Sequence, residues 1–435
     1  MKFFLKTIKM SMLVLATAHS AWALGATAES IIEDAGLTVF VAGQPAKAEE
    51  VNDNIANLLN KITELQQSTG GGSINVNCDS DPSALKGAIS QGKRTINFTG
   101  NCNGPIYPYT RVTLIGSGVS ASSINSFSES ADDDVVVWNK NGRVDIKNTT
   151  INNLHFDTAI GSDQASEIRL ENVNIVGPGL TVVLDGETTD TRCIFARQGS
   201  YRLTNVNIKG CSTGVHAAHG SYVRIQTRGV GGSSTITSAG EGTNFPIFAE
   251  HNSTVELRNG VTVNNSAIDR DDFYVSVVAV LSSTIKLNGA MVEGIYAGWS
   301  SAVEMRSGNI GEELVVDGGS LWFKGGSFSS SVIIEGINSM LVFDVDVDVD
   351  ELELNGSTLI VEGGRVNANA FSLTDYSSAE FISGKTHNLG DILFHNSQIK
   401  ILDNSAINGQ ANDCYDQNDV YVEVGSHNGM TDPCP

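Results

Sequence analysis

Short stretches of alternating apolar and polar residues recur along most of the chain. One six-residue pattern reads Asn-Ser-Thr-Val-Glu-Leu at its first clear copy, with apolar side chains at its fourth and sixth positions. Its seven clear copies begin at Asn252, Ser282, Ser300, Gly318, Asn338, Gly356 and Asn396. With one degenerate copy included, the fourth position moves from Ile285 to Ile399 in six steps, a mean of about 19 residues per step. Alternation with a period of two predicts half-buried β-strands.

The length of this repeat excludes most repeat architectures. A leucine-rich repeat would need its L-x-x-L-x-L signature, which is missing, and a propeller blade needs about 40 residues. A coil of three short parallel strands fits, because each coil buries its inward side chains on the coils above and below. We therefore expect an all-β fold, a right-handed parallel β-helix (a solenoid), over residues 74–410.

The pattern before the repeat is helical. Apolar residues between positions 46 and 67 follow steps of three and four, which is the spacing of a heptad seam. They are Ala48, Val51, Ile55, Leu58, Ile62 and Leu65. A glycine-rich stretch, Ser68–Ser73, follows, and such a linker has no means of packing. We expect residues 24–73 to form a separate, short N-terminal α-helical segment with a flexible linker.

The stretch from Gly43 onward resembles a segment that often precedes stalks in phage tail-fibre-like and bacterial surface proteins. The heptad seam predicts that this helix makes the protein a homo-oligomer. Isoleucine at position a with leucine at position d favours two strands, whereas tail-fibre-like proteins are usually trimers. Packing of the helix back onto the main domain is the alternative.

The first 23 residues have the pattern of an export signal. Three lysines precede a short apolar run, Met10–Ala18, and Ala21-Trp22-Ala23 supplies a small-x-small cleavage site. The run is too short to cross a bilayer, and no later stretch approaches about 20 apolar residues. We expect no membrane span and a secreted protein, destined for the periplasm, the cell surface or the medium.

The charge of the chain is strongly negative. The formal net charge is −22, and it becomes −25 without the leader, which carries three lysines and no acidic residue. Such a surface repels phosphate backbones and argues against nucleic acid as a partner. It also disfavours simple electrostatic capture of an anionic polysaccharide, unless a cation or a local basic patch intervenes.

Six cysteines in a chain bound for an oxidising compartment predict disulfides. In chain order, the second cysteine of each pair follows the first by roughly 18 to 24 residues, close to one coil of the repeat. The partners would then lie on adjacent coils, about 4.8 Å apart, within the Cα separation that a disulfide accepts. The expected bridges are Cys78–Cys102, Cys193–Cys211 and Cys414–Cys434. The last would close a C-terminal segment, residues 411–435.

The stretch Arg94–Gly118, preceded by a short amphipathic helix at Pro82–Ile89, resembles the opening coils of the pectin-lyase-like β-helix superfamily. In that superfamily a helix caps the N-terminal end and a Val-Thr-Leu-Ile-Gly type of strand begins the stack. The resemblance extends through the repeat over most of residues 75–410. It implies the fold but no activity, since the superfamily includes lyases, hydrolases, tailspikes and adhesins.

An acidic run follows Phe343, where aspartates alternate with valines. In an extended strand Asp344, Asp346 and Asp348 would face outward. Calcium prefers several carboxylate oxygens, so these residues are candidate Ca²⁺ ligands. Outward residues of one strand lie about 6.6 Å apart, which makes a solvated acidic face the simpler interpretation.

Three successive copies of the repeat carry apolar residues at the outward position, namely Trp322, Val342 and Ile360. Exposed apolar patches of this kind mark contact surfaces. Cover by a loop or by another subunit is one explanation. The other is a platform for sugar rings, in which Trp322 binds carbohydrate.

The coils between residues 203 and 285 are longer, with steps of about 30 residues instead of about 19. Insertions on a rigid scaffold often carry function. In an enzyme that acts on a uronate, Arg270 would lie near the sugar carboxylate and His219 or His251 would act as the base. Asp271 could instead help to hold a calcium ion in place of Arg270. The W-I-D-H and G-H-G motifs of related enzymes are absent.

Two classes of function stay open. The first is a non-catalytic secreted or cell-surface protein that binds glycans or a partner along its flank, with no required cofactor. The second is a polysaccharide lyase or glycoside hydrolase that acts on an acidic polysaccharide. The missing motifs and the stalk-like N-terminal segment favour the first.

Overall fold

The computed structural model describes residues 72–127, 135–140, 142–162, 166–179, 181–184, 187–239, 245–264, 275–329, 331–402, 405–415 and 421–424. The chain divides into two units, residues 1–71 and 72–435. The leader and the heptad segment therefore lie outside the described residues, and the expectations for them stay predictions. Within the described ranges, no helix is long and apolar enough to span a bilayer.

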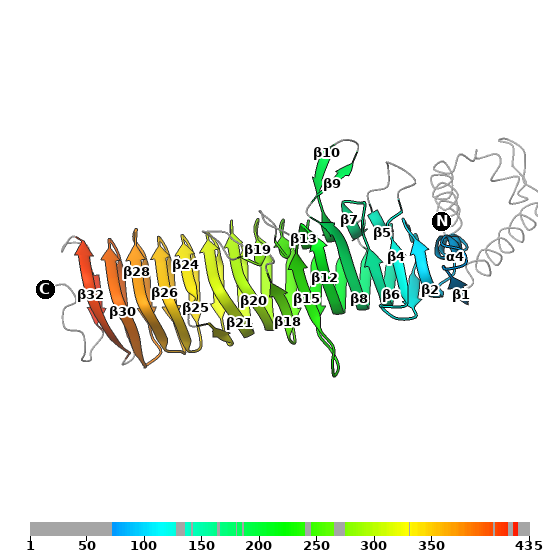
Figure 1. The fold of residues 1–435 in the computed structure, drawn as a ribbon. Coiled ribbons are helices and arrows are strands. Elements are labelled where there is room, and N and C mark those ends of the chain that lie inside the picture. The colour runs from blue at the N-terminus through cyan, green and yellow to red at the C-terminus, as the bar shows by residue number, and fades with distance from the viewer. Residues whose placement is uncertain are drawn as a thin grey trace, which may run out of the picture. The chain divides into compact units, whose positions relative to one another are not determined.

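The second unit is nearly all β-structure, as expected. Its strands form one 31-stranded sheet and a separate two-stranded hairpin, and they succeed one another along a single axis (Figure 1). The described residues contain one helix, α4 (Ala84–Ser90), which begins within the predicted stretch and buries Leu85 and Ala88. All described pairings are parallel, except that between the hairpin strands β9 (Thr181–Leu184) and β10 (Glu187–Asp190).

The pairings arrange the strands in three parallel stacks, and the longer strands contribute to more than one. Stack 1 contains β1 (Ser73–Asn77), β2 (Thr95–Asn103), β3 (Val112–Gly116), β6 (Arg143–Asn152), β8 (Glu167–Gly179), β12 (Ser200–Cys211), β14 (Tyr222–Gln226), β17 (Thr254–Arg258), β20 (Thr284–Gly298), β21 (Ala302–Asp317), β22 (Ser320–Phe323), β25 (Met340–Phe343), β27 (Thr358–Val361), β29 (Ser378–Phe381), β31 (Gln398–Ile401) and β33 (Tyr421–Val424).

Stack 2 uses further segments of β2, β6, β8, β12, β20 and β21, together with β4 (Ser122–Asn125), β15 (Ser234–Ser238), β18 (Val261–Asn264), β23 (Ser327–Phe328), β26 (Val347–Asn355), β28 (Val366–Thr374), β30 (Thr386–His395) and β32 (Ala406–Tyr415). Stack 3 contains β5 (Val135–Asn139), β7 (Thr158–Ser162), β11 (Arg192–Arg197), β13 (Thr213–Ala218), β16 (Ile247–Ala249), β19 (Val277–Ala279), β24 (Ile333–Ile337) and the later segments of β20, β21, β26, β28, β30 and β32. The same chain thus returns to each stack once per coil.

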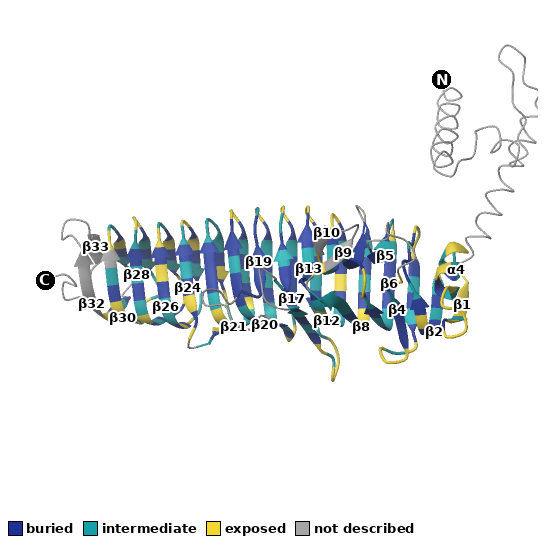
Figure 2. Cartoon of the chain, turned by 45° about the horizontal axis from the view of Figure 1, so that its top comes forward, coloured by how far each residue is buried: buried dark blue, intermediate teal, exposed yellow. Residues whose placement is uncertain are grey.

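The register of stack 1 confirms the alignment of the repeat. Leu321 pairs with Val303 on one side and with Leu341 on the other, and all three are buried. Buried and exposed positions alternate along these strands (Figure 2). Each fully buried Leu or Val contributes roughly 1.5–3 kcal/mol of transfer free energy. Stacked coils therefore share one continuous core.

Two of the three predicted disulfides are present. Cys78 and Cys102 are bonded with their Cα atoms 4.9 Å apart, and Cys193 and Cys211 with theirs 5.6 Å apart. The first ties the residue after β1 to β2, beside α4. Cys434 lies outside the described residues, so its bridge to Cys414 stays a prediction.

Candidate functional site

Aromatic side chains follow one another along the outward face of stack 3. In each strand of stack 3 one outward residue lies between two inward residues. On successive coils this outward residue is Trp138, Gly161, Phe195, His216, Phe248, Val278 and Tyr296. We call Trp138, Phe195, His216, Phe248 and Tyr296 the aromatic row. All five are partly exposed, while their neighbours in the strands are mostly buried.

Close packing along the strands orients the aromatic row. A Cβ atom at Gly161 would lie 2.3 Å from the Trp138 ring, so that ring covers the neighbouring coil and needs a glycine beneath it. The centroid of the His216 ring lies 5.1 Å from that of Phe195 and 5.1 Å from that of Phe248. These are distances of normal aromatic contact. The rings of Phe195, His216 and Phe248 on adjacent coils therefore form one continuous surface.

Cations lie against the same rings. The guanidinium of Arg192 is 5.1 Å from the centroid of Phe195. Lys140 Nζ is 5.7 Å from the Trp138 ring and 5.5 Å from the Tyr107 ring. Contacts at this distance are cation–π interactions. The face therefore combines aromatic surface with hydrogen-bond donors.

A polar cluster adjoins the aromatic row on the elongated coils. Glu250 Oε1 lies 2.9 Å from His216 Nε2, and Glu250 Oε2 lies 3.3 Å from His251 Nδ1. The rings of His251 and His219 are stacked, with their centroids 4.9 Å apart. The structure thus brings two of the predicted catalytic residues together, beside a carboxylate that the sequence had not singled out.

The turn geometry explains why the two histidines meet. His219 and His251 both have positive φ, 55° and 53°, at the equivalent turn after β13 and after β16. The Gly220 N–H donates to the His251 carbonyl, which fixes one turn on the other. Left-handed residues are uncommon outside glycine, although His tolerates the region better than branched residues do. The stacked turns place one imidazole above the other.

Burial lowers the pKa of His216 below its ordinary value, and Arg192 adds to this effect, although the hydrogen bond to Glu250 opposes it. His216 is therefore neutral near pH 7. Glu250 Oε1 is an acceptor, so in the neutral imidazole the hydrogen lies on Nε2 and the Nε2–H group donates a hydrogen bond to Glu250. At the far end of the row, burial and the nearby Asp317 carboxylate raise the pKa of Tyr296. The Tyr296 hydroxyl donates to Asp317 over 3.2 Å.

The other predicted catalytic residues, Arg270 and Asp271, lie outside the described residues. The register does confirm the long coils around them. Ile225 pairs with Leu257, and Leu257 pairs in turn with Leu287, so the elongated steps lie where the sequence predicted them. The roles assigned to Arg270, Asp271, His219 and His251 stay predictions.

Trp322 lies in a different place, on the outward face of stack 1. It pairs with Glu304 and with Val342, which itself pairs with Ile360, and it is about one third exposed at 36%. The apolar stripe predicted from the repeat therefore exists. It is separate from the aromatic row, which belongs to stack 3.

Two of the three predicted calcium ligands, Asp346 and Asp348, have hydrogen-bond partners of their own. Asp346 accepts the Arg365 N–H over 2.8 Å, which together with Lys385 holds the pKa of its carboxyl below the usual range. Asp348 accepts a hydrogen bond from Asn367. Among the described residues, no group of three or more His, Cys, Asp or Glu side chains is arranged to hold a metal ion. Calcium binding by Asp344, Asp346 and Asp348 stays a prediction.

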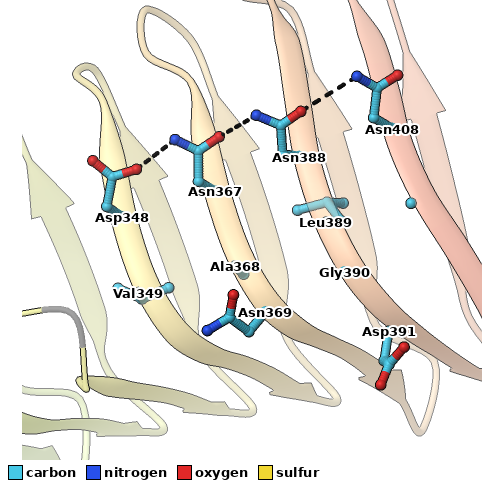
Figure 3. Close-up of a pocket in the computed structure, with 11 residues that line it drawn as sticks. Asp348, Val349, Asn367, Ala368, Asn369, Asn388, Leu389, Gly390, Asp391 and Asn408 are labelled. Carbon is cyan, nitrogen blue, oxygen red and sulfur yellow. Dashed lines mark hydrogen bonds between the residues drawn. The ribbon is translucent and has the colours of Figure 1, made fainter.

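Asp348 begins a ladder of amides instead (Figure 3). Asn367 donates to Asp348, Asn388 donates to Asn367 over 2.7 Å, and Asn408 donates to Asn388 over 3.3 Å. These side chains line a shallow cavity of about 590 Å³ on the outward face of stack 2. Within the ladder Asn367 and Asn388 each donate one hydrogen bond and accept one, and the carboxylates Asp348 and Asp391 line the same cavity.

Sequence reasoning missed the aromatic row, although a signal for it exists. The strands of stack 3 read Ile-Phe-Ala, Val-His-Ala, Ile-Phe-Ala, Val-Val-Ala and Ile-Tyr-Ala from Ile194, Val215, Ile247, Val277 and Ile295. The third residue is always alanine and always buried. This second repeat, aligned on its alanine, would have identified the outward residue of each coil.

Comparisons with known proteins add little. No family model matches the chain, and no curated protein matches it. Among solved structures, the catalytic domain of a GH87 alpha-1,3-glucanase in complex with tetrasaccharides is similar at a TM-score of 0.35 and 15% sequence identity. The match covers 82% of this chain and 68% of that one. A TM-score this low supports no functional argument.

Proposed function

We propose that this protein is a secreted, right-handed parallel β-helix that binds polysaccharide along the aromatic row, without catalysis. The three stacks of parallel strands, each visited once per coil, support the β-helix. Two disulfides support export, because such bonds persist in oxidising compartments. The main evidence for polysaccharide binding is the aromatic row itself.

The aromatic row suits a sugar chain for geometric and chemical reasons. Phe195 and Phe248 are two coils apart, about 10 Å, so an extended glycan along the axis can meet several rings. The apolar faces of pyranose rings pack on aromatic surfaces, while hydroxyl groups need polar partners at the edge. Glu250, His251 and Arg192 provide such partners beside the rings.

Binding of the purified protein to a carbohydrate array tests this function. The affinity for the neutral glycan that binds best is then measured. Phe195→Ala and Phe248→Ala should each weaken binding about tenfold, a loss of about 1.4 kcal/mol. Tyr376→Ala, which removes an aromatic ring 85% exposed at a turn outside the row, is the matched control and should bind as the parent does. Unchanged binding in both Phe variants, or a loss confined to Trp322→Ala, would reject the aromatic row as the site.

A glycoside hydrolase or polysaccharide lyase is the second candidate. Glu250 between His216 and His251 is the observation that favours it, because a carboxylate and a neutral imidazole are the groups that such reactions use. Hydrolysis would release reducing ends and elimination would give an unsaturated, ultraviolet-absorbing product. If the parent protein gives either signal and Glu250→Gln does not, the protein is an enzyme rather than a non-catalytic binding protein.

A further inference from the structure

The outward face of stack 1 carries a concentration of cations that is unusual for this acidic chain. From β6 to the residue after β22, its cationic side chains are Arg143, Lys147, Arg169, Arg202, Arg224, Arg258, Lys286, Arg306 and Lys324. We call these nine residues the basic surface. The carboxylates among them are the five residues Asp145, Glu167, Glu171, Glu256 and Glu304. With nine cations and five carboxylates, the face has an excess of four positive charges.

The rest of the chain has the opposite balance. Residues 325–402 contain eleven Asp and Glu residues and three Lys and Arg residues. The formal net charge of the whole chain is −22. The basic surface is thus a local region of positive charge on a negatively charged protein. Charges that lie within about 8–10 Å of one another act together at physiological ionic strength.

Three arginines form the centre of the basic surface. Arg202 pairs with Arg169 on one side and with Arg224 on the other, so the three guanidiniums start from adjacent coils about 4.8 Å apart. Like charges at paired positions are unfavourable. The Arg202 side chain is 50% exposed, and its ion pair with Glu167 is long, at 3.7 Å. Glu167 is also 2.6 Å from Arg169, so Arg202 keeps donors for an added anion.

Beyond Arg224, two carboxylates organise the cations rather than neutralise them. Glu256 is 7% exposed and accepts hydrogen bonds from Tyr222, from Arg224 Nε over 2.8 Å and from Arg258 Nε over 2.6 Å. Burial alone would raise the pKa of Glu256, but these hydrogen bonds hold it below its usual value. The carboxylate is therefore ionised near pH 7 and fixes both guanidiniums.

Glu304 has the same role two strands further along stack 1. It accepts hydrogen bonds from Arg306, at 2.9 and 2.8 Å, and lies 3.9 Å from Lys286 Nζ and 3.7 Å from Lys324 Nζ. A shallow cavity of about 320 Å³ lies over this area of the face, lined by residues of both groups. Four cations and two carboxylates line the cavity, so it is positively charged, and the carboxylates hold the arginine donors in place before a ligand arrives.

We propose that the basic surface binds an anionic polysaccharide, a chain whose sugars carry uronate carboxylates. The cations recur over eight successive strands of stack 1, a length of about 34 Å, which suits a polymer better than a single small anion. Arginine binds carboxylates with paired N–H donors.

This proposal rests on the proposed function, but it concerns a second surface and a charged ligand. The interleaved carboxylates and the net negative charge disfavour the denser charge of nucleic acid. An aromatic row for neutral sugars and a basic surface for charged ones would let the protein hold a mixed polysaccharide, or two different ones, by separate faces.

Binding of polygalacturonate to the purified full chain tests the proposal, with dextran, a sulfated dextran and duplex DNA as comparison probes. Polygalacturonate should bind more tightly than dextran, and its affinity should fall as salt is added. Arg202→Gln should weaken polygalacturonate binding about tenfold and Lys286→Gln several-fold, while Arg202→Lys keeps some of the affinity. Lys400→Gln, which removes an exposed cation of the same row outside the basic surface, is the matched control.

Melting temperatures verify that each variant is folded. Equal polygalacturonate binding by the parent, Arg202→Gln and Lys286→Gln would overturn the proposal, as would binding of DNA or sulfated dextran in clear preference to polygalacturonate. Phe248→Ala separates the two surfaces. If Phe195→Ala and Phe248→Ala both leave neutral glycan binding intact, the aromatic row is not the glycan-binding site. The effect of Arg202→Gln on polygalacturonate binding still tests the basic surface independently.

Discussion

Two regions of the stacked sheet, residues 143–324 and 325–402, differ in where they place their aromatic residues. In the second region phenylalanines fill the core, where Phe343 lies 6.2 Å from Phe323 and Phe371 lies 6.4 Å from Phe381. In the first region the corresponding inward column of stack 1 carries leucine, isoleucine and methionine as far as Met305 and has its first phenylalanine at Phe323, while phenylalanines and a tyrosine lie outward on stack 3. The outward aromatic side chains of the first region are partly exposed, whereas Phe343, Phe371 and Phe381 of the second region are buried.

Coil length differs in the same way. In the second region the inward residue of stack 1 advances in nearly equal steps, through Phe323, Phe343, Val361, Phe381 and Ile401. In the first region the steps are unequal and often longer, through Leu170, Leu203, Ile225, Leu257, Leu287 and Met305. Regular coils maximise contact with their neighbours, and insertions provide loops and polar clusters. The second region is therefore a stack of regular coils, while the first region combines the same stack with the candidate binding surfaces.

The largest expected effect is in the core of the regular region. Phe343→Ala removes a fully buried ring between Phe323 and the next coil, and should lower the free energy of unfolding by about 3–5 kcal/mol. Val342→Ala, at the neighbouring outward position, is the control and should cost much less. Chemical denaturation measures both, and hydrogen exchange should report the loss of protection in residues 323–381 first. An equal loss in the two variants would mean that the inward column does not stabilise this region.

The first region should depend on its disulfide. Reduction of Cys193–Cys211, or Cys193→Ser with Cys211→Ser, removes a crosslink that spans 18 residues, and should cost about 3 kcal/mol by the loop-entropy relation. Protection against hydrogen exchange should fall in β11, β12 and β13 and persist in β27 to β31. Loss of protection along the whole chain would show instead that the two regions unfold as one unit.

The smallest expected effect is a pH response of the regular region. His387 is fully buried, accepts the Val366 N–H at Nδ1 over 3.1 Å and lies 3.1 Å from Ser383 Oγ through Nε2. Burial, with repulsion from Arg365, lowers its pKa to about 4. Because the folded pKa lies below the unfolded value of about 6.5, its stabilisation is complete above pH 6.5 and is lost as the pH falls toward 4.

Between pH 7 and pH 5 this group should reduce the free energy of unfolding by about 2 kcal/mol. Denaturation curves at the two pH values measure the difference in the parent protein and in His387→Gln. The variant should lose this component of the pH dependence even if it is less stable overall. A pH response that is the same in both proteins would place its origin elsewhere.

Much of the fold follows from local pattern. The apolar positions of the repeat predicted the strands and register of stack 1, because an inward side chain every second residue must be buried by the next coil. The spacing of Cys193 and Cys211 predicted their bridge for the same reason. The helix near Pro82 followed from its apolar face.

The candidate surfaces were less accessible to this reasoning. His219 and His251 were selected as separate candidates, and their separation along the chain did not indicate that their rings would stack. Glu250 was noted among the polar residues of the elongated coils but was given no role, because an isolated carboxylate has no distinctive sequence context. Trp322 was chosen because it interrupts a polar position, yet the larger group of outward aromatic residues lies on strands whose repeat was not aligned.

By itself the sequence determined that the chain forms stacked β-strands with alternating inward and outward residues, since burial along a strand has a period of two. Where the coils are unequal in length, the tertiary structure alone decided which outward residues become neighbours. Coils of unequal length hide that relation in the linear sequence, whereas backbone hydrogen bonds align one residue of each strand with one residue of the next. Arg169, Arg202 and Arg224 form one basic surface because that register places them side by side.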